Sequence, residues 1–271
     1  MARMGAPARE WAIRTAAACS VIALVSLVLR ETWPDPAKSA VLASAAVAGF
    51  WLAFRFLPGF DPLFRVRCRL PGGLRGERRC AITFDDGPSQ ATEAVLDILA
   101  AEHVPATFFI LGVNAERYPD VVRRAQAEGH AVGIHGMTHT KLVGASEEAV
   151  EQEVLGTMET LTRIGIRPSK VYRTPHGFKS RGVFAVARRH GLTLWAWSRG
   201  VWDTDAPAPA VLVRRATRLA GSGMVLLLHD GRGDERNPDI GPMLSALPPI
   251  LKELKRRGFT FVSLTELHSR V

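Results

Sequence analysis

Cysteine is scarce in this 271-residue chain, which contains only Cys19, Cys68 and Cys80. Three cysteines without C-x-x-C spacing do not build a disulfide scaffold. Cys19 lies in an apolar run, where a cysteine acts as a small hydrophobic residue. Cys68 and Cys80 could pair in an oxidising compartment, but we expect free thiols, so the cysteines do not identify the compartment.

Excess charge is absent from the larger, C-terminal part of the chain. The net charge of the whole chain is +9, of which residues 1–79 carry +7 and residues 80–271 carry only +2. A nucleic-acid-binding domain would spread basic charge over its folded surface, with aromatic residues among it. We therefore expect no nucleic-acid partner.

Each apolar run is shorter than the ~20 residues that a membrane-spanning helix needs. Two uncharged, mostly apolar runs cover residues 15–29 and 39–54, with a polar, proline-rich break between them. They could form a two-helix membrane hairpin, a cleaved signal peptide or a pair of buried soluble helices. We expect the hairpin, because no small-x-small cleavage site precedes Arg30 and a second run follows so soon. Residues 1–56 would then be an anchor in membrane lipid, and residues 57–79 a basic linker.

The basic residues predict the orientation of this anchor. Several arginines flank the pair of runs on both outer sides, whereas the break contains only Arg30 and Lys38. Positive charge favours the cytoplasmic side of a membrane. We therefore expect the cell membrane as the location, with the C-terminal domain at its cytoplasmic face.

Residues 64–70 alternate strictly between apolar and basic positions. This period of two predicts a short strand with one apolar and one basic face. The basic face could meet anionic lipid head groups, or it could protect a solvated edge strand.

Strand-like and helix-like segments alternate from Cys80 to the C-terminus. Expected strands cover residues 80–84, 106–111, 130–135, 171–173, 193–197, 224–229 and 259–264. Expected helices cover residues 92–102, 114–126, 146–165, 180–189, 207–220 and 243–257. About seven β–α repeats predict an α/β fold with a parallel barrel.

Two adjacent carboxylates, Asp85 and Asp86, follow the first of these strands. Ligands bind at the carboxyl ends of strands in α/β sheets. Adjacent acids are costly there unless positive charge lies beside them. A divalent metal would supply that charge.

His135 and His139 are the candidate nitrogen ligands for such a metal. His139 follows His135 by about one helical turn, so both imidazoles could face one point. Two histidines and one carboxylate leave coordination positions open, as a catalytic zinc site requires. Alone, such a pair is more often two unrelated surface or core histidines. Here the aspartates and the histidines each end a β-like run, which favours the metal site.

Five motifs, in order, resemble those of the polysaccharide deacetylase family (the NodB-homology domain, carbohydrate esterase family 4). They are Thr83-Phe84-Asp85-Asp86-Gly87-Pro88, His135-x-x-x-His139, Arg173-Thr174-Pro175-His176-Gly177, Trp197 to Asp203, and Leu226-Leu227-Leu228-His229-Asp230. The resemblance covers residues 80–271 and implies a distorted, incomplete (β/α)7-type barrel for that domain.

The resemblance implies a metal-dependent hydrolase that removes N-acetyl or other N-acyl groups from amino sugars of a glycan or a lipid-linked glycan. Asp86, His135 and His139 match the family's metal ligands, and Asp85 matches its catalytic base. Zinc is the first expected cofactor, with cobalt, manganese or iron as alternatives. Spacing alone does not decide which aspartate takes which role.

Three further catalytic roles follow from the resemblance. Arg173 would hold Asp85 ionised and oriented. His229 would protonate the leaving amine, and Asp203 would raise the pKa of His229 and fix its tautomer.

The remaining matches concern the substrate pocket. The backbone N–H of His176 would stabilise the oxyanion, although the family usually has an aromatic residue there. Trp197 and Leu228 would line the acyl or sugar pocket, and simple core packing explains both residues equally well.

Gly136 departs from the family pattern, which has Ser or Thr there. This change could loosen the ligand loop or alter the metal preference. Gly136 also occupies the place of the Glu in the H-E-x-x-H motif, which argues against a zinc peptidase. The alternative function is a catalytically inactive, membrane-anchored sugar-binding module on the same fold, which a lost catalytic group would indicate. No such group is lost in the sequence.

Overall fold

The computed structural model describes residues 41–42, 44–45, 66–71 and 77–265. The chain divides into two compact units, Met1–Leu57 and Pro58–Val271. Apart from four helical residues between 41 and 45, the expected membrane hairpin lies outside the described residues, as does the expected linker up to residue 65. No helix within the described part is both long and apolar enough to cross a membrane.

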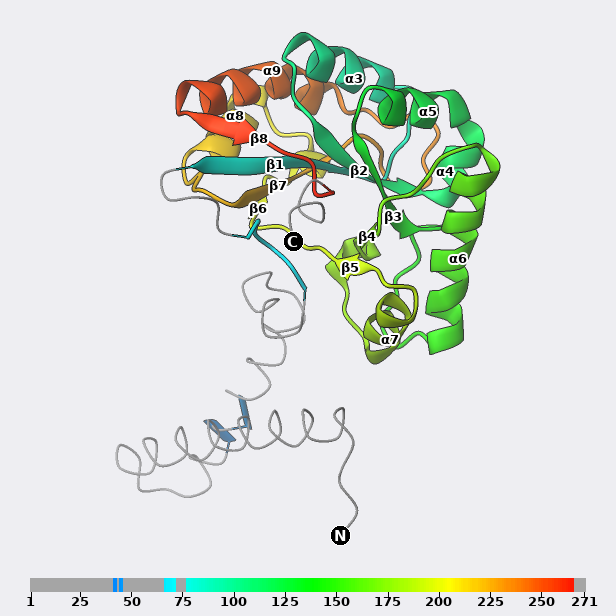
Figure 1. The fold of residues 1–271 in the computed structure, drawn as a ribbon. Coiled ribbons are helices and arrows are strands. Elements are labelled where there is room, and N and C mark those ends of the chain that lie inside the picture. The colour runs from blue at the N-terminus through cyan, green and yellow to red at the C-terminus, as the bar shows by residue number, and fades with distance from the viewer. Residues whose placement is uncertain (1–40, 43, 46–65, 72–76, 266–271) are drawn as a thin grey trace, which may run out of the picture. The chain divides into compact units, whose positions relative to one another are not determined.

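A parallel sheet forms the centre of the second unit (Figure 1). Its eight strands are β1 (Arg78–Asp85), β2 (Ala106–Leu111), β3 (Ala131–Gly136), β4 (Val171–Tyr172), β5 (Thr193–Leu194), β6 (Arg199–Gly200), β7 (Met224–His229) and β8 (Phe259–Phe261). The order is β5-β4-β3-β2-β1-β7-β6, and β8 pairs with β1. The described ends of this sheet, β5 and β6, do not pair with each other, so the sheet is a half-barrel. The predicted α/β class is confirmed, but β6 was not predicted.

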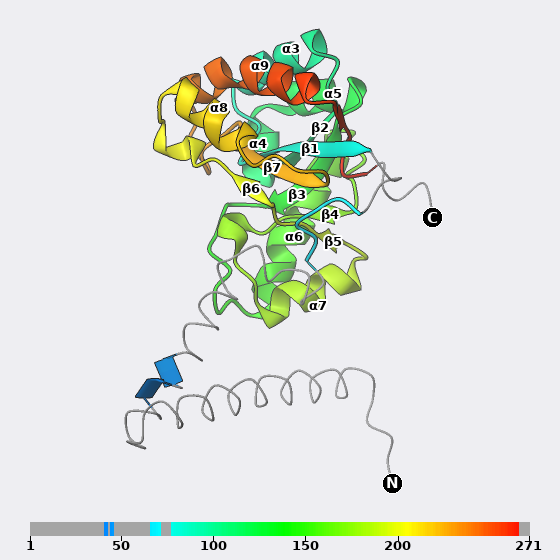
Figure 2. The same ribbon diagram turned by 90° about the vertical axis from the view of Figure 1, so that its left-hand side faces the viewer.

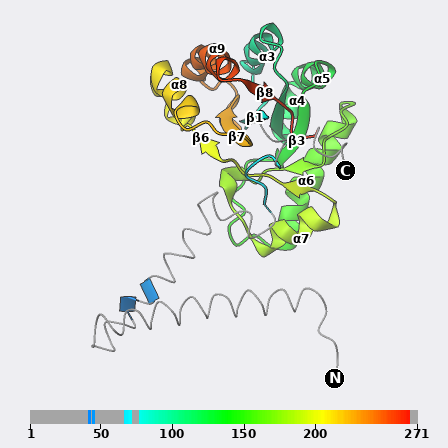
Figure 3. The same ribbon diagram turned by 60° about the vertical axis from the view of Figure 1, so that its left-hand side comes forward.

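Helices cover the outside of the sheet (Figures 2 and 3). They are α3 (Thr92–Ala101), α4 (Gly112–Arg117), α5 (Pro119–Ala127), α6 (Glu147–Arg163), α7 (Arg181–Arg189), α8 (Pro209–Thr217) and α9 (Gly241–Arg256). Ser146 and Ser180 cap α6 and α7, as expected for serines at these positions. The single helix predicted over 114–126 is wrong: Tyr118 has a φ of −130°, and Pro119 begins a second helix there.

The two faces of β1 explain where the site lies. Ile82 and Phe84 point outward into the apolar core beneath the helices. Ala81 belongs to a second cluster, with Phe109 and Trp195. Because side chains alternate along a strand, Asp85 lies on the same inner face of the sheet as Ala81. Asp85 is the last residue of β1, so this face ends in a carboxylate.

Residues 66–70, which we expected in the linker, belong to the folded unit. Val66, Cys68 and Leu70 are buried, and the two arginines between them are exposed, so the predicted alternation is correct. Backbone bridges join this segment to Trp195 beyond β5 and to the start of β7. Cys68 and Cys80 are both buried and form no disulfide with each other.

Candidate functional site

A cavity of about 390 Å³ opens at the carboxyl ends of β1, β3 and β7. The parallel register sets Asp85 of β1 directly beside His229 of β7. Residues from all five sequence motifs meet in this one place. The lining residues are Asp85, Asp86, His135, His139, His176, Gly177, Trp197, Thr204, Leu227, His229, Arg232 and Gly233.

Asp86, His135 and His139 form one cluster, in which one ligand atom from each lies within 4.8 Å of the others. Oδ1 of Asp86 is 3.2 Å from Nε2 of His135 and 3.0 Å from Nε2 of His139. Their spacing of four residues suggested one turn of a helix, but the two histidines do not lie on a helix. His135 is in strand β3, and His139 is in the following loop with a φ of 61°.

Backbone strain turns these ligands toward one another. Asp86 has a φ of 70°, which directs its side chain into the same cavity as Asp85 rather than to the opposite face. Left-handed backbone is unfavourable for residues with a Cβ. Its concentration at Asp86, His139 and His176 is typical of a functional site.

The cluster has the chemistry of a divalent metal site. His135 donates a hydrogen bond from Nδ1 to the backbone oxygen of Arg173 at 2.8 Å, so the lone pair on Nε2 is available for a metal. Oδ1 of Asp86 is buried and accepts no well-aligned hydrogen bond from the described residues. Burial alone would raise the pKa of Asp86, but the imidazoles of His135 and His139 hold it well below its usual range. Two imidazole nitrogens and one carboxylate oxygen therefore fit a metal with open positions.

The loop after Gly136 is pinned rather than loose. One carboxylate oxygen of Glu153, on α6, accepts hydrogen bonds from the backbone N–H of Met137 at 2.7 Å and of Thr138 at 2.9 Å. The other accepts from the Thr138 hydroxyl at 2.7 Å. Gly136 has a φ of 103°, which side chains rarely allow, and a Cβ there would lie 3.1 Å from the Glu153 carboxylate. The expectation that Gly136 loosens the ligand loop is wrong.

Arg173 holds Asp85 in place. Its Nη1 donates to Oδ1 of Asp85 at 2.7 Å and to Oγ1 of Thr83 at 2.8 Å, and all three residues are buried. Its Nη2 donates to the backbone oxygen of Ala196 at 2.9 Å, and its guanidinium lies 4.1 Å from the centre of the Phe109 ring. The Asp85 carboxylate therefore has one orientation, with Oδ2 3.8 Å from Nε2 of His135.

His229 and Asp203 form the second pair of the cavity. Nδ1 of His229 donates to Oδ1 of Asp203 at 2.9 Å, and the backbone N–H of His229 donates to Oδ2 at 2.7 Å. Burial lowers the pKa of His229, but the hydrogen bond and the charge of Asp203, together with the charges of Asp86 and Asp85, outweigh it and raise the pKa to about 9. With Nδ1 engaged, Nε2 is the nitrogen left to transfer a proton.

Trp197 lines the cavity, as predicted, and so does His176, but Leu228 does not. Leu228 is fully buried in the core beneath the helices. Leu227 takes its expected place, because residue 227 shares a strand face with His229 and residue 228 points the other way. The rule of alternation was available in the sequence and would have identified Leu227.

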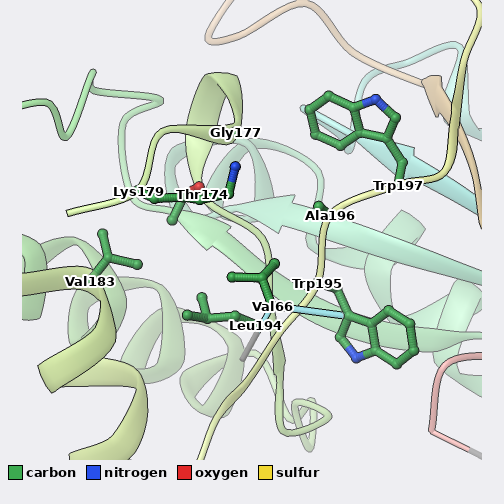
Figure 4. A pocket seen from close by; sticks show the side chains of 9 residues that line it. All are labelled: Val66, Thr174, Gly177, Lys179, Val183, Leu194, Trp195, Ala196 and Trp197. Atoms are coloured by element: carbon green, nitrogen blue, oxygen red, sulfur yellow. The ribbon is translucent and has the colours of Figure 1, made fainter. Parts of the chain in front are cut away.

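The wall behind Trp197 is tightly packed. Figure 4 shows Trp195 and Trp197 on opposite sides of the segment that carries them, with Ala196 between. The space that they border with Gly177 has a volume of only about 10 Å³, about enough for one water molecule. A Cβ on Gly177 would lie 2.9 Å from the Trp197 ring. This space does not extend the 390 Å³ cavity. Trp197 therefore forms a closed wall of that cavity.

Asp230 is neither solvated nor in the cavity. It is fully buried, and Thr92 donates a hydrogen bond to its carboxylate at 2.7 Å. Ser89 donates to its backbone oxygen at 2.6 Å. Burial raises the pKa of Asp230 to about 7. The residue thus fastens the loop after β1 to the end of β7.

Sequence reasoning missed several residues that support or line the site. Thr83, Glu153 and Asn114 hold Arg173, the loop after Gly136 and the backbone of Asp86 in place; Asn114 donates at 2.8 Å to the backbone oxygen of Asp86 and to that of Gly233. Thr204 and Arg232 line the cavity. Glu153 and Asn114 lie on helices far from the motifs in sequence, so no local pattern marked them.

Comparisons with known proteins agree with this geometry. A family model described as polysaccharide deacetylase matches residues 73–195. A peptidoglycan-N-acetylglucosamine deacetylase from Bacillus cereus is 35% identical over 194 residues, covering 70% of this chain and 88% of the relative. A chitooligosaccharide deacetylase from a Bradyrhizobium strain is 35% identical over 217 residues, covering 77% and 99%. A crystal structure of a peptidoglycan N-acetylglucosamine deacetylase superposes with a TM-score of 0.67 at 29% identity, covering 72% of this chain and 90% of that one.

Proposed function

This chain belongs to the polysaccharide deacetylase family, and from that premise we propose that it is a metal-dependent hydrolase that removes N-acetyl groups from amino sugars of a glycan. One observation carries the proposal. A three-residue ligand cluster, Asp85 and His229 line one cavity large enough for a sugar residue, with Arg173 paired to Asp85 and Asp203 paired to His229. These are the parts that hydrolysis of an amide requires: a base, an acid and a site for a Lewis acid.

Asp86, His135 and His139 would hold the metal. A divalent ion there would polarise the amide carbonyl and lower the pKa of the attacking water. Zinc suits two imidazoles and one carboxylate, and cobalt, manganese or iron could also occupy such a donor set.

The protein's own groups move the protons. Asp85, held by Arg173, takes a proton from the water that attacks the acyl carbon. The backbone N–H of His176 would stabilise the negative charge on the carbonyl oxygen. When the C–N bond breaks, His229 donates its Nε2 proton to the sugar nitrogen, and Asp203 stabilises the protonated imidazole until then. The products are acetate and a free amino sugar.

Acetate release tests this proposal. The full-length chain is freed of metal, reloaded with zinc, cobalt or manganese, and incubated with N-acetylated oligosaccharides from chitin and from peptidoglycan. We expect acetate with at least one metal and none from the Asp85→Asn variant. Tight binding of these sugars without acetate release would refute the proposal and favour the inactive sugar-binding module.

We also propose that residues 1–56 anchor the enzyme in the cell membrane, with the catalytic domain at the cytoplasmic face and lipid-linked amino sugars among its substrates. The two apolar runs and the arginines that flank them support this proposal. Alkaline phosphatase fused at residue 38 should be active outside the cytoplasm, and a fusion at residue 271 should be inactive. The opposite pattern would refute the orientation.

A further inference from the structure

Arg232 extends the site on one side of the cavity. It lies in the loop after β7, three residues beyond His229, and it lines the same cavity. Its Nη2 donates a hydrogen bond at 2.7 Å to the backbone oxygen of Thr204, which also lines the cavity. Thr204 follows Asp203 in the short 3-10 helix Asp203–Asp205. The guanidinium is therefore held between the loop that follows the acid His229 and the 3-10 helix that carries its partner, Asp203.

The charge of Arg232 is not balanced within the cavity wall. Asp85 is paired with Arg173, and Asp203 is paired with His229. Within the described part of the chain, no carboxylate lies within 4.0 Å of the Arg232 guanidinium. A guanidinium has five N–H donors, and one hydrogen bond to Thr204 leaves others for a ligand.

We propose that Arg232 binds an acidic group, a carboxylate or a phosphate, on the sugar substrate and so selects anionic glycans over neutral ones. The inference rests on the proposed deacetylase function and names its substrate class. An arginine fork matches the oxygens of a carboxylate or phosphate, often through two hydrogen bonds. His229 must face the sugar nitrogen to protonate it, so the loop that follows His229 and carries Arg232 borders the sugar rather than the acetyl group.

Two matched substrate pairs separate the sources of such an acidic group. The first is an N-acetylated peptidoglycan oligosaccharide that carries lactyl carboxylates, compared with its methyl ester. The second is an N-acetylglucosamine with a phosphate at C1, compared with the same sugar as a methyl glycoside. The kcat/KM for acetate release by the metal-loaded, full-length enzyme is measured on all four. We expect the wild type to favour the anionic member of at least one pair by about tenfold or more, the size of a charged hydrogen bond.

Three variants locate the effect. Arg232→Gln should reduce that preference to about one, and Arg232→Lys should retain part of it, because lysine keeps the charge without the fork. Arg236→Gln is the matched control: Arg236 lies in the same loop but is exposed and does not line the cavity. It removes the same charge, so a preference that came only from long-range attraction would fall equally in both Gln variants.

The outcomes separate this inference from the proposed function. A wild type that releases acetate equally from both members of each pair would overturn the role of Arg232 and leave the deacetylase function intact. So would a preference that survives in Arg232→Gln or falls equally in Arg236→Gln. Acetate release from none of the four substrates would refute the deacetylase proposal and this inference with it. The wild-type preference is measured without any variant, so a poorly folded Arg232→Gln protein does not remove the test.

Discussion

Replacing Asp203 by Asn should move the alkaline limit of activity. Asp203 accepts two hydrogen bonds from His229, one from the ring and one from the backbone. An asparagine keeps the size of the side chain but removes its charge and can accept only one of these bonds. Burial, which by itself lowers the pKa of His229, is then less opposed.

The expected size of the effect follows from the pKa of His229. It is about 9 in the folded protein, compared with an ordinary value of 6.5. If the variant returns to the ordinary value, about 3% of His229 is protonated at pH 8 instead of about 90%. The concentration of the general acid falls about thirtyfold, which corresponds to ~2 kcal/mol in apparent activation free energy at that pH.

The assay is a pH profile of kcat for acetate release between pH 5.5 and 10. A protonated general acid is needed, so the wild-type rate should fall as the pH rises through the pKa of His229. In Asp203→Asn the fall should begin about two pH units lower. A cation bound beside Asp86 would lower the pKa of His229 in both proteins, so the difference between the two profiles is the quantity to compare.

Asp205→Asn provides the control for this prediction. Asp205 lies two residues along the same 3-10 helix, and it is exposed. Its variant should have the wild-type profile. If Asp203→Asn has the same alkaline limb as the wild type, His229 is not the proton donor or Asp203 does not set its pKa.

Three other changes test the site and its surroundings. His139→Ala should reduce the bound metal from about one ion per chain to well below that, because it removes one of three ligands; elemental analysis of the purified protein measures it, and unchanged metal would place the site elsewhere. Arg173→Met should lower the free energy of unfolding in urea by about 3–5 kcal/mol, because it leaves the buried Asp85 carboxylate unpaired; a loss of activity with unchanged stability would contradict this. Leu228→Ala should cost about 2–5 kcal/mol of stability with little effect on KM, because Leu228 lies in the core. Leu227→Ala should mainly change KM and acyl preference, because Leu227 lines the cavity. The reverse result would show that Leu228, and not Leu227, faces the cavity.

The α/β class and most of the site could be predicted from the sequence, because both depend on local patterns. Alternating apolar runs and capped helices predicted the parallel sheet, and Ser146 and Ser180 begin their helices as expected. The motif residues stand at strand ends, and parallel strands bring those ends together at one edge. Asp85 and His229 therefore meet although 144 positions separate them in the chain.

Only the tertiary structure decided how the side chains point. The left-handed backbone at Asp86 and His139, rather than a helical turn, brings the metal ligands together. Glu153 holds the ligand loop from a helix that no motif marks. Arg232 lines the cavity beside Thr204, to whose backbone oxygen it donates a hydrogen bond across 28 positions of the chain. Sequence patterns report which residues share a strand or helix face, whereas backbone strain in loops and contacts between distant elements depend on how the whole domain packs.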